Sequence, residues 1–270
     1  MVRFRMPVAV LFALAALLFG SLRYLRAASA SPVPVSDEAY AAPILVELFT
    51  SEGCSSCPPA DALLEKLDRD QPVNGPQRIV LSEHVDYWDD IGWRDPYSSH
   101  ELSERQSAYA AQFGQGSVYT PQMVVDGRYE FVGSDERRAT QAIRDAAKAM
   151  KSAVSISFGV RDEKTITLHI EAGPLPPSGT AKSANVFLAI ADNSDKSQVG
   201  GGENAGRTLT HVAVLRNLNR IGAVDTTAGF SRDMKIDLDA RNQRNARIVV
   251  IVQEASAGRV WGAGLTRVSN

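Results

Sequence analysis

The chain has 270 residues, of which 44% are apolar and 22% are charged, a composition typical of a soluble globular protein. This composition excludes collagen-like, disordered and polytopic membrane chains, and the length allows one or two hydrophobic cores. Residues 1–30 hold four of the 29 basic residues and none of the 31 acids, so the remainder has 25 bases and a net charge of −6. Such a mildly acidic body argues against a nucleic-acid partner, which needs a basic face.

The N-terminal segment has the layout of an export signal. An unbroken apolar run over residues 8–19 follows two arginines and precedes the small-residue sequence Ala28-Ser29-Ala30. We therefore expect residues 1–30 to be a signal peptide and the protein to be periplasmic or secreted. Two further arginines near the end of this segment leave an uncleaved N-terminal anchor open, which is the only membrane attachment we expect. Residues 31–42 are expected to be a linker.

Residues 43–151 alternate between strand and helix patterns. Pro58 and Pro59 suit the first turn of the first helix, where a missing N–H group is harmless. Ser98 with Glu101 predicts a capping box, and Asp126-Gly127 predicts a hairpin turn. Strands are expected at 44–49, 78–83, 122–125 and 129–132, and helices at about 60–67, 98–113 and 135–151.

Residues 152–270 alternate apolar and polar side chains, a pattern that predicts strands. The stretch Asp192–Gly206, rich in Gly, Asn and Ser, is expected to be the longest loop of this half. Because no convincing helix is present, this half predicts a small all-β, sandwich-like domain. Its strands are expected at 154–160, 166–170, 186–190, 208–215, 234–238, 248–252 and 260–265.

The only two cysteines, Cys54 and Cys57, form a Cys-x-x-Cys pair where the first strand passes into the first helix. Two cysteines are too few for a disulfide-stapled scaffold or for a zinc site of four thiolates. At a helix N-terminus, unpaired N–H groups and the helix dipole stabilise a thiolate. We therefore assign Cys54 as the nucleophile and Cys57 as the thiol that resolves the mixed disulfide. The two serines between them affect the thiolate only through hydrogen bonds.

The strand, the dithiol, the helix behind it, and a Thr-Pro before a hairpin and a last helix together resemble the thioredoxin fold. More closely, the chain from residue 43 to the C-terminus resembles a bacterial family of exported thioredoxin-like proteins catalogued as a domain of unknown function. Four motifs carry this resemblance: Leu-Phe-Thr-Ser-Glu-Gly-Cys-Ser-Ser-Cys-Pro-Pro-Ala-Asp, His-Val-Asp-Tyr-Trp-Asp, Tyr-Thr-Pro-Gln-Met-Val-Val-Asp-Gly and Gly-Glu-Asn-Ala-Gly-Arg-Thr-Leu-Thr-His. We therefore expect an α/β thioredoxin-like domain over residues 43–151, followed by an all-β, sandwich-like domain over residues 152–270.

The resemblance also implies roles for individual residues. In thioredoxins the proline opposite the dithiol is cis, so we expect a cis Thr120–Pro121 bond and expect both residues to pair with the extended backbone of a substrate. Glu47 matches the buried acid of the first central strand, where burial would raise its pKa and let it accept the proton of Cys57. A partly exposed Glu47 that faces solvent is the alternative. Gly53 before the pair and the serines within it depart from thioredoxin, so redox potential and partner choice are not carried over.

The segment that follows His84 is rich in aromatic and acidic side chains. We expect Tyr87, Trp88 and Trp93 to line a substrate-binding groove beside the dithiol, because loops that concentrate such side chains are frequent binding surfaces. The alternative is a lid that packs on itself and is capped by its own aspartates.

A polar cluster surrounds the Gly-rich loop of the second half. His211 taken alone is expected to be a core histidine. Against this, it shares the polar cluster with Glu203, Asn204 and Arg207. The candidate accessory residues of the site are His84, His211, Glu203 and Arg207. In this interpretation the loop folds over the dithiol and gates it, or it meets a second subunit in a homodimer.

These features predict a thiol–disulfide oxidoreductase that acts on a protein or small thiol or disulfide substrate. We expect no cofactor beyond the reversible Cys54–Cys57 disulfide, and no residue is assigned as a metal ligand. Two alternatives remain open. In one, the disulfide is static and the β-rich half supplies a binding surface. In the other, a histidine joins the cysteines in a copper site, as in exported copper-handling thioredoxin relatives, which space their cysteines one residue further apart.

Overall fold

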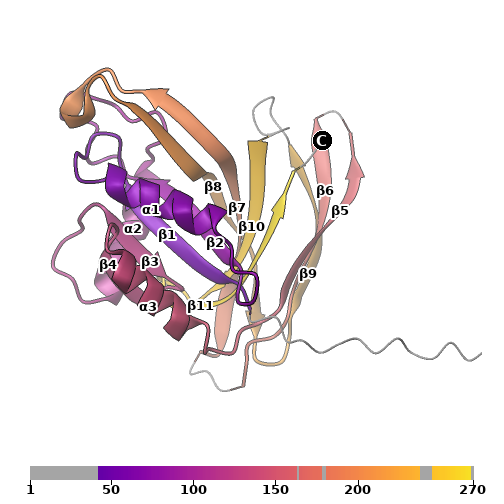
Figure 1. Ribbon diagram of the computed structural model, residues 1–270. Coiled ribbons are helices and arrows are strands. Elements are labelled where there is room, and N and C mark those ends of the chain that lie inside the picture. The colour runs from indigo at the N-terminus through magenta and orange to yellow at the C-terminus, as the bar shows by residue number, and fades with distance from the viewer. Residues whose placement is uncertain (1–41, 163, 178–180, 238–244, 269–270) are drawn as a thin grey trace, which may run out of the picture. The chain divides into compact units, whose positions relative to one another are not determined.

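The computed structural model describes residues 42–162, 164–177, 181–237 and 245–268 (Figure 1). The expected export signal, and all of the expected linker but its last residue, lie outside the described residues. Within those residues, no helix combines the length and the apolar character needed to cross a membrane.

The first half contains the seven elements that the sequence predicts. The hairpin at Asp126-Gly127 is confirmed, as is the start of the first helix at Pro58. The capping box is wrong, because the second helix begins at His100 and the Ser98 hydroxyl instead donates to Asp89 Oδ2 at 2.7 Å. The elements are β1 (Ile44–Thr50), α1 (Pro58–Arg69), β2 (Arg78–His84), α2 (His100–Gln112), β3 (Gln122–Val125), β4 (Tyr129–Val132) and α3 (Glu136–Ala146).

In the second half, every expected strand is present, but the strands expected at 186–190 and 208–215 are far longer than the sequence predicts. These two strands pair with each other as far as Gln198 and Thr208. The first part of the expected loop Asp192–Gly206, residues 192–198, is therefore strand, because its polar residues belong to a hairpin rather than to an irregular segment. The strands are β5 (Val154–Arg161), β6 (Thr165–Ala172), β7 (Ser183–Gln198), β8 (Thr208–Asp225), β9 (Phe230–Asp237), β10 (Ala246–Gln253) and β11 (Val260–Arg267).

The expected fold class, a thioredoxin-like domain followed by a separate all-β sandwich-like domain, is wrong. Strands from both sides of residue 151 form one mixed eight-stranded sheet in the order β11-β10-β7-β8-β2-β1-β3-β4. The two halves meet where β8 runs parallel to β2, with Ser82 opposite Val214. The strands β5, β6 and β9 form a second, smaller sheet in the order β5-β6-β9. The chain is thus mostly β, and its described part belongs to one compact unit, Tyr40–Asn270.

The packing explains why the sheet is continuous. On one face, α1 and α3 cover apolar side chains of β1 and β3, including Val46, Leu48 and Met123. On the other face, buried side chains from both halves share a core, and burial of this apolar surface favours a joint sheet over two separate ones. That shared core comprises Leu45, Ile79, Leu81, Leu102, Ala189, Ala191, Leu215, Val249, Ile251, Val260 and Ala263.

The β7–β8 hairpin determines what surrounds the dithiol. In Figure 1 the two strands run past α1, and their connecting turn lies beyond the sheet. This turn, residues 199–207, is closed by main-chain bonds between Val199 and Arg207 at 2.9 Å and between Gly206 and Val199 at 2.8 Å. We call residues 199–207 the strap.

Candidate functional site

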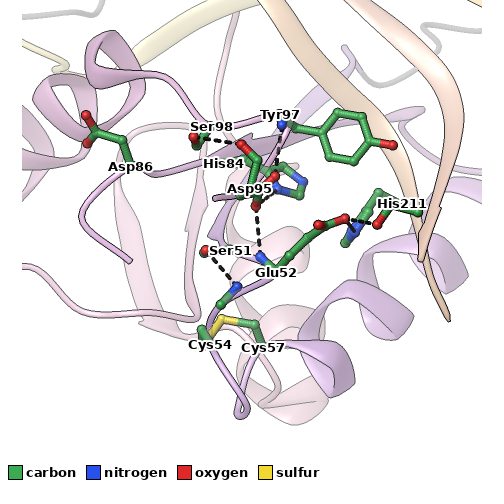
Figure 2. Close-up of polar contacts among 12 residues, drawn as sticks. Ser51, Glu52, Cys54, Cys57, His84, Asp86, Asp95, Tyr97, Ser98 and His211 are labelled. Atoms are coloured by element: carbon green, nitrogen blue, oxygen red, sulfur yellow. Dashed lines mark hydrogen bonds and ion pairs between the residues drawn. A yellow bond between two sulfur atoms is a disulfide. The ribbon is translucent and has the colours of Figure 1, made fainter. Parts of the chain in front are cut away.

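The two cysteines are joined in a disulfide at the start of α1 (Figure 2). The N–H of Cys54 donates to the Ser51 carbonyl at 3.2 Å, and the N–H of Cys57 donates to the Cys54 carbonyl at 3.2 Å. Cys57 is the N-cap residue of α1. The expected succession of strand, dithiol and helix is therefore present, with Cys57 closest to the positive end of the helix dipole and Cys54 in the turn before it.

Both cysteines are completely buried, with 0% exposure, whereas the two serines between them are exposed. The Ser56 hydroxyl lies 3.3 Å from Cys54 Sγ. Because a disulfide sulfur carries no proton, the hydroxyl is the donor of this contact. The same hydroxyl is in place to donate to a Cys54 thiolate, which agrees with the serine role that the sequence predicts.

The strap holds the turn that carries the disulfide. The Asn204 side-chain amide donates to the main-chain carbonyls of Glu52 at 2.8 Å and Cys54 at 2.9 Å. The Glu203 carboxylate accepts from the Ser55 N–H at 3.0 Å. Arg207 in turn donates from Nη1 to the Asn204 carbonyl oxygen at 2.7 Å, which fixes the orientation of the amide. The structure thus brings Glu203 and Arg207 to the dithiol, although they lie about 150 residues away in sequence.

The strap also packs closely on the aromatic segment between β2 and α2. A Cβ atom at Gly201 would lie 2.2 Å from the carbonyl oxygen of Gly92, so only glycine fits at this position. Trp93 lies beneath the strap, and its indole N–H donates to Glu52 Oε2 at 2.7 Å. Tyr87 is 42% exposed, and its hydroxyl donates to Gln106 at 3.1 Å.

Trp88 connects Thr120 to the turn that carries the dithiol, and Pro121 lies beside the first turn of α1. The Trp88 indole N–H donates to Thr120 Oγ1 at 2.8 Å, and a Cβ atom at Gly53 would lie 3.2 Å from Trp88 Cβ. Pro121 packs with Ala60 of the first turn of α1 around Gly133, whose absent Cβ would lie 3.1 Å from both. The Thr120–Pro121 bond is cis, which confirms that prediction.

Glu52, which sequence reasoning did not single out, is the centre of the polar contacts behind the disulfide. Its side chain is fully buried, its Oε1 accepts from the hydroxyl of Ser197, and its main-chain N–H donates to Asp95 Oδ2 at 2.8 Å. Burial acts to raise the pKa of Glu52, but hydrogen bonds from His211 and Ser197 lower it below its ordinary value. The carboxylate is therefore ionised and held in place at neutral pH.

His211 is buried between the Glu52 turn and α1. Its Nε2 lies 3.3 Å from Glu52 Oε1, and its Nδ1 lies 3.8 Å from Asp61 Oδ1. Burial acts to lower the pKa of His211, but the Asp61 and Glu52 carboxylates raise it to about 10. His211 is accordingly a core histidine, as the sequence favours, and it is a cation across the physiological range.

A second buried pair, His84 with Asp95, adjoins this group. His84 Nδ1 lies 2.7 Å from Asp95 Oδ2, and the His84 and His211 rings meet edge to face with centroids 4.6 Å apart. Burial acts to raise the pKa of Asp95, but the charge and hydrogen bond of His84 lower it to about 2. The side chains of Glu52, Asp95, His84 and His211 converge in Figure 2, above the disulfide.

Glu47 is fully buried, so the solvent-facing alternative is wrong. Arg105 Nε donates to its Oε1 at 3.0 Å, and the Tyr109 hydroxyl donates to its Oε2 at 2.6 Å. Arg105 also pairs with Glu83 at 3.4 Å and donates to Gln253 of β10 at 3.0 Å. The carboxylate therefore joins β1 to α2 and β10, and its expected proton exchange with Cys57 stays a prediction.

In the part of the chain that the structure describes, no group of three or more His, Cys, Asp or Glu side chains is arranged to hold a metal ion. The arrangement consists instead of a disulfide, a hydroxyl donor at one sulfur, and buried ion pairs behind it. The hydroxyl donor favours a thiolate at Cys54, whereas the carboxylates of the ion pairs oppose it.

Of the residues that sequence reasoning missed, only Glu52 has a recognisable signal in the sequence around it. Glu52 lies two residues before Cys54 in an otherwise uncharged stretch, which marks it as a candidate buried charge. The role of Arg105 depends on contacts between distant segments, which the sequence pattern of either segment does not contain.

Comparison with solved structures includes two matches with TM-scores above 0.6. A protein from Agrobacterium tumefaciens, solved by X-ray crystallography, is 26% identical with a TM-score of 0.65, over 85% of this chain and 96% of that one. HBP35 of Porphyromonas gingivalis has a similar fold at 13% identity and a TM-score of 0.62, over 85% of this chain and 76% of that one. No curated protein sequence matches. The family model described as protein of unknown function (DUF1223) matches residues 45–253, and the chain therefore belongs to that family.

Proposed function

We propose that this protein exchanges electrons with thiol and disulfide substrates through Cys54 and Cys57. The observation that carries the proposal is the disulfide itself, formed across two residues at the N-terminus of α1. A disulfide that closes so short a loop restricts the unfolded chain less than one that closes a long loop. A redox role therefore accounts for the pair better than a role in stability.

The reaction follows the chemistry of thiol–disulfide exchange. A substrate thiolate attacks Cys54 Sγ, the S–S bond breaks, and Cys57 leaves as a thiolate. A second substrate thiolate then attacks the substrate sulfur of this mixed disulfide and releases Cys54. The substrate loses two electrons and becomes a disulfide, while the protein gains two electrons. The two protons of the substrate thiols pass through solvent to the protein thiols. The reverse sequence reduces a substrate disulfide, with Cys54 as nucleophile and Cys57 as resolving thiol.

Access to the sulfurs requires the strap to open, because both cysteines are fully buried. The contacts that close it are three hydrogen bonds, from Asn204 and to Glu203, on the turn that carries the disulfide. Trp88 lies against this turn and its indole N–H donates to Thr120, so Trp88 and the Thr120–Pro121 segment would contact a substrate backbone after opening.

Complete burial also favours a second candidate function, a binding protein in which the disulfide is static. In that case the strap would be a permanent part of the core, and the β-rich half would supply the working surface. The two candidates differ in whether Cys54 ever forms a bond with another molecule.

Trapping of mixed disulfides tests the proposal. The Cys57→Ser variant keeps the nucleophile and removes the resolving thiol, so it should accumulate mixed disulfides with partner proteins in cell extracts, and the matched control Cys54→Ser should not. The wild-type protein should also catalyse the reduction of insulin by an added dithiol. Absence of trapped partners together with absence of insulin reduction would establish the static disulfide instead.

Export is part of the same proposal. The apolar segment at residues 8–19 and the small residues at 28–30 support delivery to the periplasm or the exterior, where disulfides persist. Fractionation of cells that express the full chain tests it, with recovery in the cytoplasmic fraction as the contradicting result.

A further inference from the structure

The elements that carry the two cysteines are bridged by one side chain from the other half of the protein. Glu52 is two residues before Cys54, and Asp61 is four residues after Cys57, where its N–H donates to the Cys57 carbonyl at 3.1 Å. His211 of β8 lies between them, 3.3 Å from Glu52 Oε1 and 3.8 Å from Asp61 Oδ1. Its side chain is 1% exposed and that of Glu52 is 0% exposed, so water screens this group very little.

The charges of this group act on any thiolate formed from the disulfide. Two carboxylates beside the dithiol oppose a third negative charge on sulfur, and this repulsion is strong where the effective dielectric constant is low. The His211 cation offsets one of the two, so the group formed by Glu52, Asp61 and His211 has a net charge of −1 instead of −2.

We infer that His211 is a positioning residue whose buried cation compensates the carboxylates behind the dithiol and thereby favours the thiolate of the reduced cysteine pair. The inference rests on the proposed function for its biological meaning. Its physical content, the effect of a buried charge on the Cys54–Cys57 equilibrium, is measurable without any protein substrate.

Several titratable side chains face His211. They come from every element packed against it: Glu52 of the disulfide turn, Asp61 of α1, His84 of β2, Tyr97 of the segment before α2, and Asp195 across the β7–β8 ladder. Only Glu52 and Asp61 form ion pairs with the His211 ring in the described residues. These two therefore define the variants that test the inference.

The test is a series of charge variants in the purified full-length chain, reduced with a phosphine. The thiolate is titrated by its ultraviolet absorbance, with the Cys54→Ser/Cys57→Ser variant as the blank, and the dithiol–disulfide equilibrium is measured in glutathione buffers. His211→Gln, which leaves both carboxylates uncompensated, should raise the thiolate pKa by about one unit and shift the equilibrium about tenfold toward the disulfide. Glu52→Gln removes one carboxylate and should shift both quantities in the opposite direction.

Two further variants separate charge from structure. His211→Lys keeps the cation and should restore the equilibrium to within about threefold of the wild type. His169→Gln is the matched control, because His169 also lies between two carboxylates, Asp233 at 2.7 Å and Glu171 at 3.4 Å, but on the three-stranded sheet. It should leave both quantities unchanged.

The opposite signs expected for His211→Gln and Glu52→Gln make the outcome decisive. Unchanged values in both variants, or shifts of the same sign, would overturn the inference. If His211→Gln does not fold, Glu52→Gln alone still decides between a shift toward the dithiol and none. Failure of the proposed function is a separate result, since it is read from trapping, insulin reduction and the potential of the wild type, whereas this inference is read from the differences between variants.

Discussion

The side-chain amide of Asn204 donates a hydrogen bond to the main-chain carbonyl of Cys54 at 2.9 Å, across 150 residues of sequence. Through this contact, the tip of the β7–β8 hairpin holds the turn that carries the disulfide. Only a continuous sheet places the two segments together, because β8 must lie beside β2 for the hairpin to reach α1. The disulfide site and the β-rich half are therefore one structure.

Loss of the Asn204 amide should open the strap. Asn204→Ala leaves the buried Glu52 and Cys54 carbonyls without these donors, which costs about 1–3 kcal/mol in the closed state. We expect a phosphine to reduce the disulfide about tenfold faster in this variant, since reduction proceeds from the opened form. The control is Asn219→Ala, an exposed position on β8. Equal reduction rates in wild type and Asn204→Ala would show that the strap does not limit access.

The hydroxyl of Ser56 should stabilise a Cys54 thiolate. Ser56 Oγ lies 3.3 Å from Cys54 Sγ, and a hydrogen bond to a charged group contributes about 1.5–3 kcal/mol. Ser56→Ala is therefore expected to raise the pKa of the Cys54 thiol by about one unit. Ser55→Ala provides the matched control, because Ser55 makes its hydrogen bonds with Glu203 of the strap. Measurement of alkylation rate against pH in reduced Cys57→Ser protein checks this, and equal shifts in both serine variants would contradict it.

The Asp95–His84 pair should make folding stability sensitive to acid. The pKa of Asp95 is lowered from 3.8 to about 2 by His84, so the carboxylate binds a proton less readily in the folded protein than in the unfolded chain. Its contribution is complete above pH 3.8 and is lost as the pH falls through about 2. Urea unfolding of the oxidised protein at a series of pH values measures this. Asp95→Asn should lose that part of the pH dependence and be less stable by about 3–5 kcal/mol at neutral pH.

Arg105 should contribute to stability as the cation that pairs with the buried carboxyl groups of Glu47 and Glu83. Burial raises the pKa of Glu83 well above its usual range despite the nearby guanidinium, so removal of Arg105 leaves two buried acids without a cation. Arg105→Leu is expected to cost about 3–5 kcal/mol in urea unfolding. Arg137→Ala, at an exposed position of α3, should cost less than about 0.5 kcal/mol.

The proton-transfer role expected for Glu47 can be tested by a substitution in the full-length protein. Glu47→Gln keeps the size of the side chain and removes its charge. If Glu47 accepts the proton of Cys57, insulin reduction should slow in this variant at neutral pH while the fold is retained. An unchanged rate would leave Glu47 with a structural role between β1 and α2.

The local structure of the first half could be predicted from sequence because its signals lie within each element. The hairpin at Asp126-Gly127, the prolines at the start of α1 and the buried run of β1 are such signals. The cis Thr120–Pro121 bond could be predicted only through a family resemblance. The separation into two domains was wrong because the change from helix-rich to strand-rich sequence at residue 151 does not show which strands pair.

The candidate site, too, could be predicted only in part, because the sequence does not show which strands pair. Cys54, Cys57 and Trp88 were predicted near one another, and the structure places them on one turn or against it. The polar end of β7, residues 192–198, has the composition of a loop, which conceals the hairpin with β8 that reaches the dithiol. For that reason the charge pair of Glu52 with His211 could not be predicted, since it depends on the pairing of β8 with β2.

The reduction potential of the Cys54–Cys57 pair tests the central claim most directly. The full-length protein would be equilibrated in glutathione buffers, and the fractions of dithiol and disulfide measured after acid quenching. A role in thiol–disulfide exchange predicts a reversible transition in the range of about −120 to −270 mV that redox-active pairs span. A disulfide that stays intact in every buffer, with a potential below about −300 mV as in structural disulfides, would contradict the proposed function.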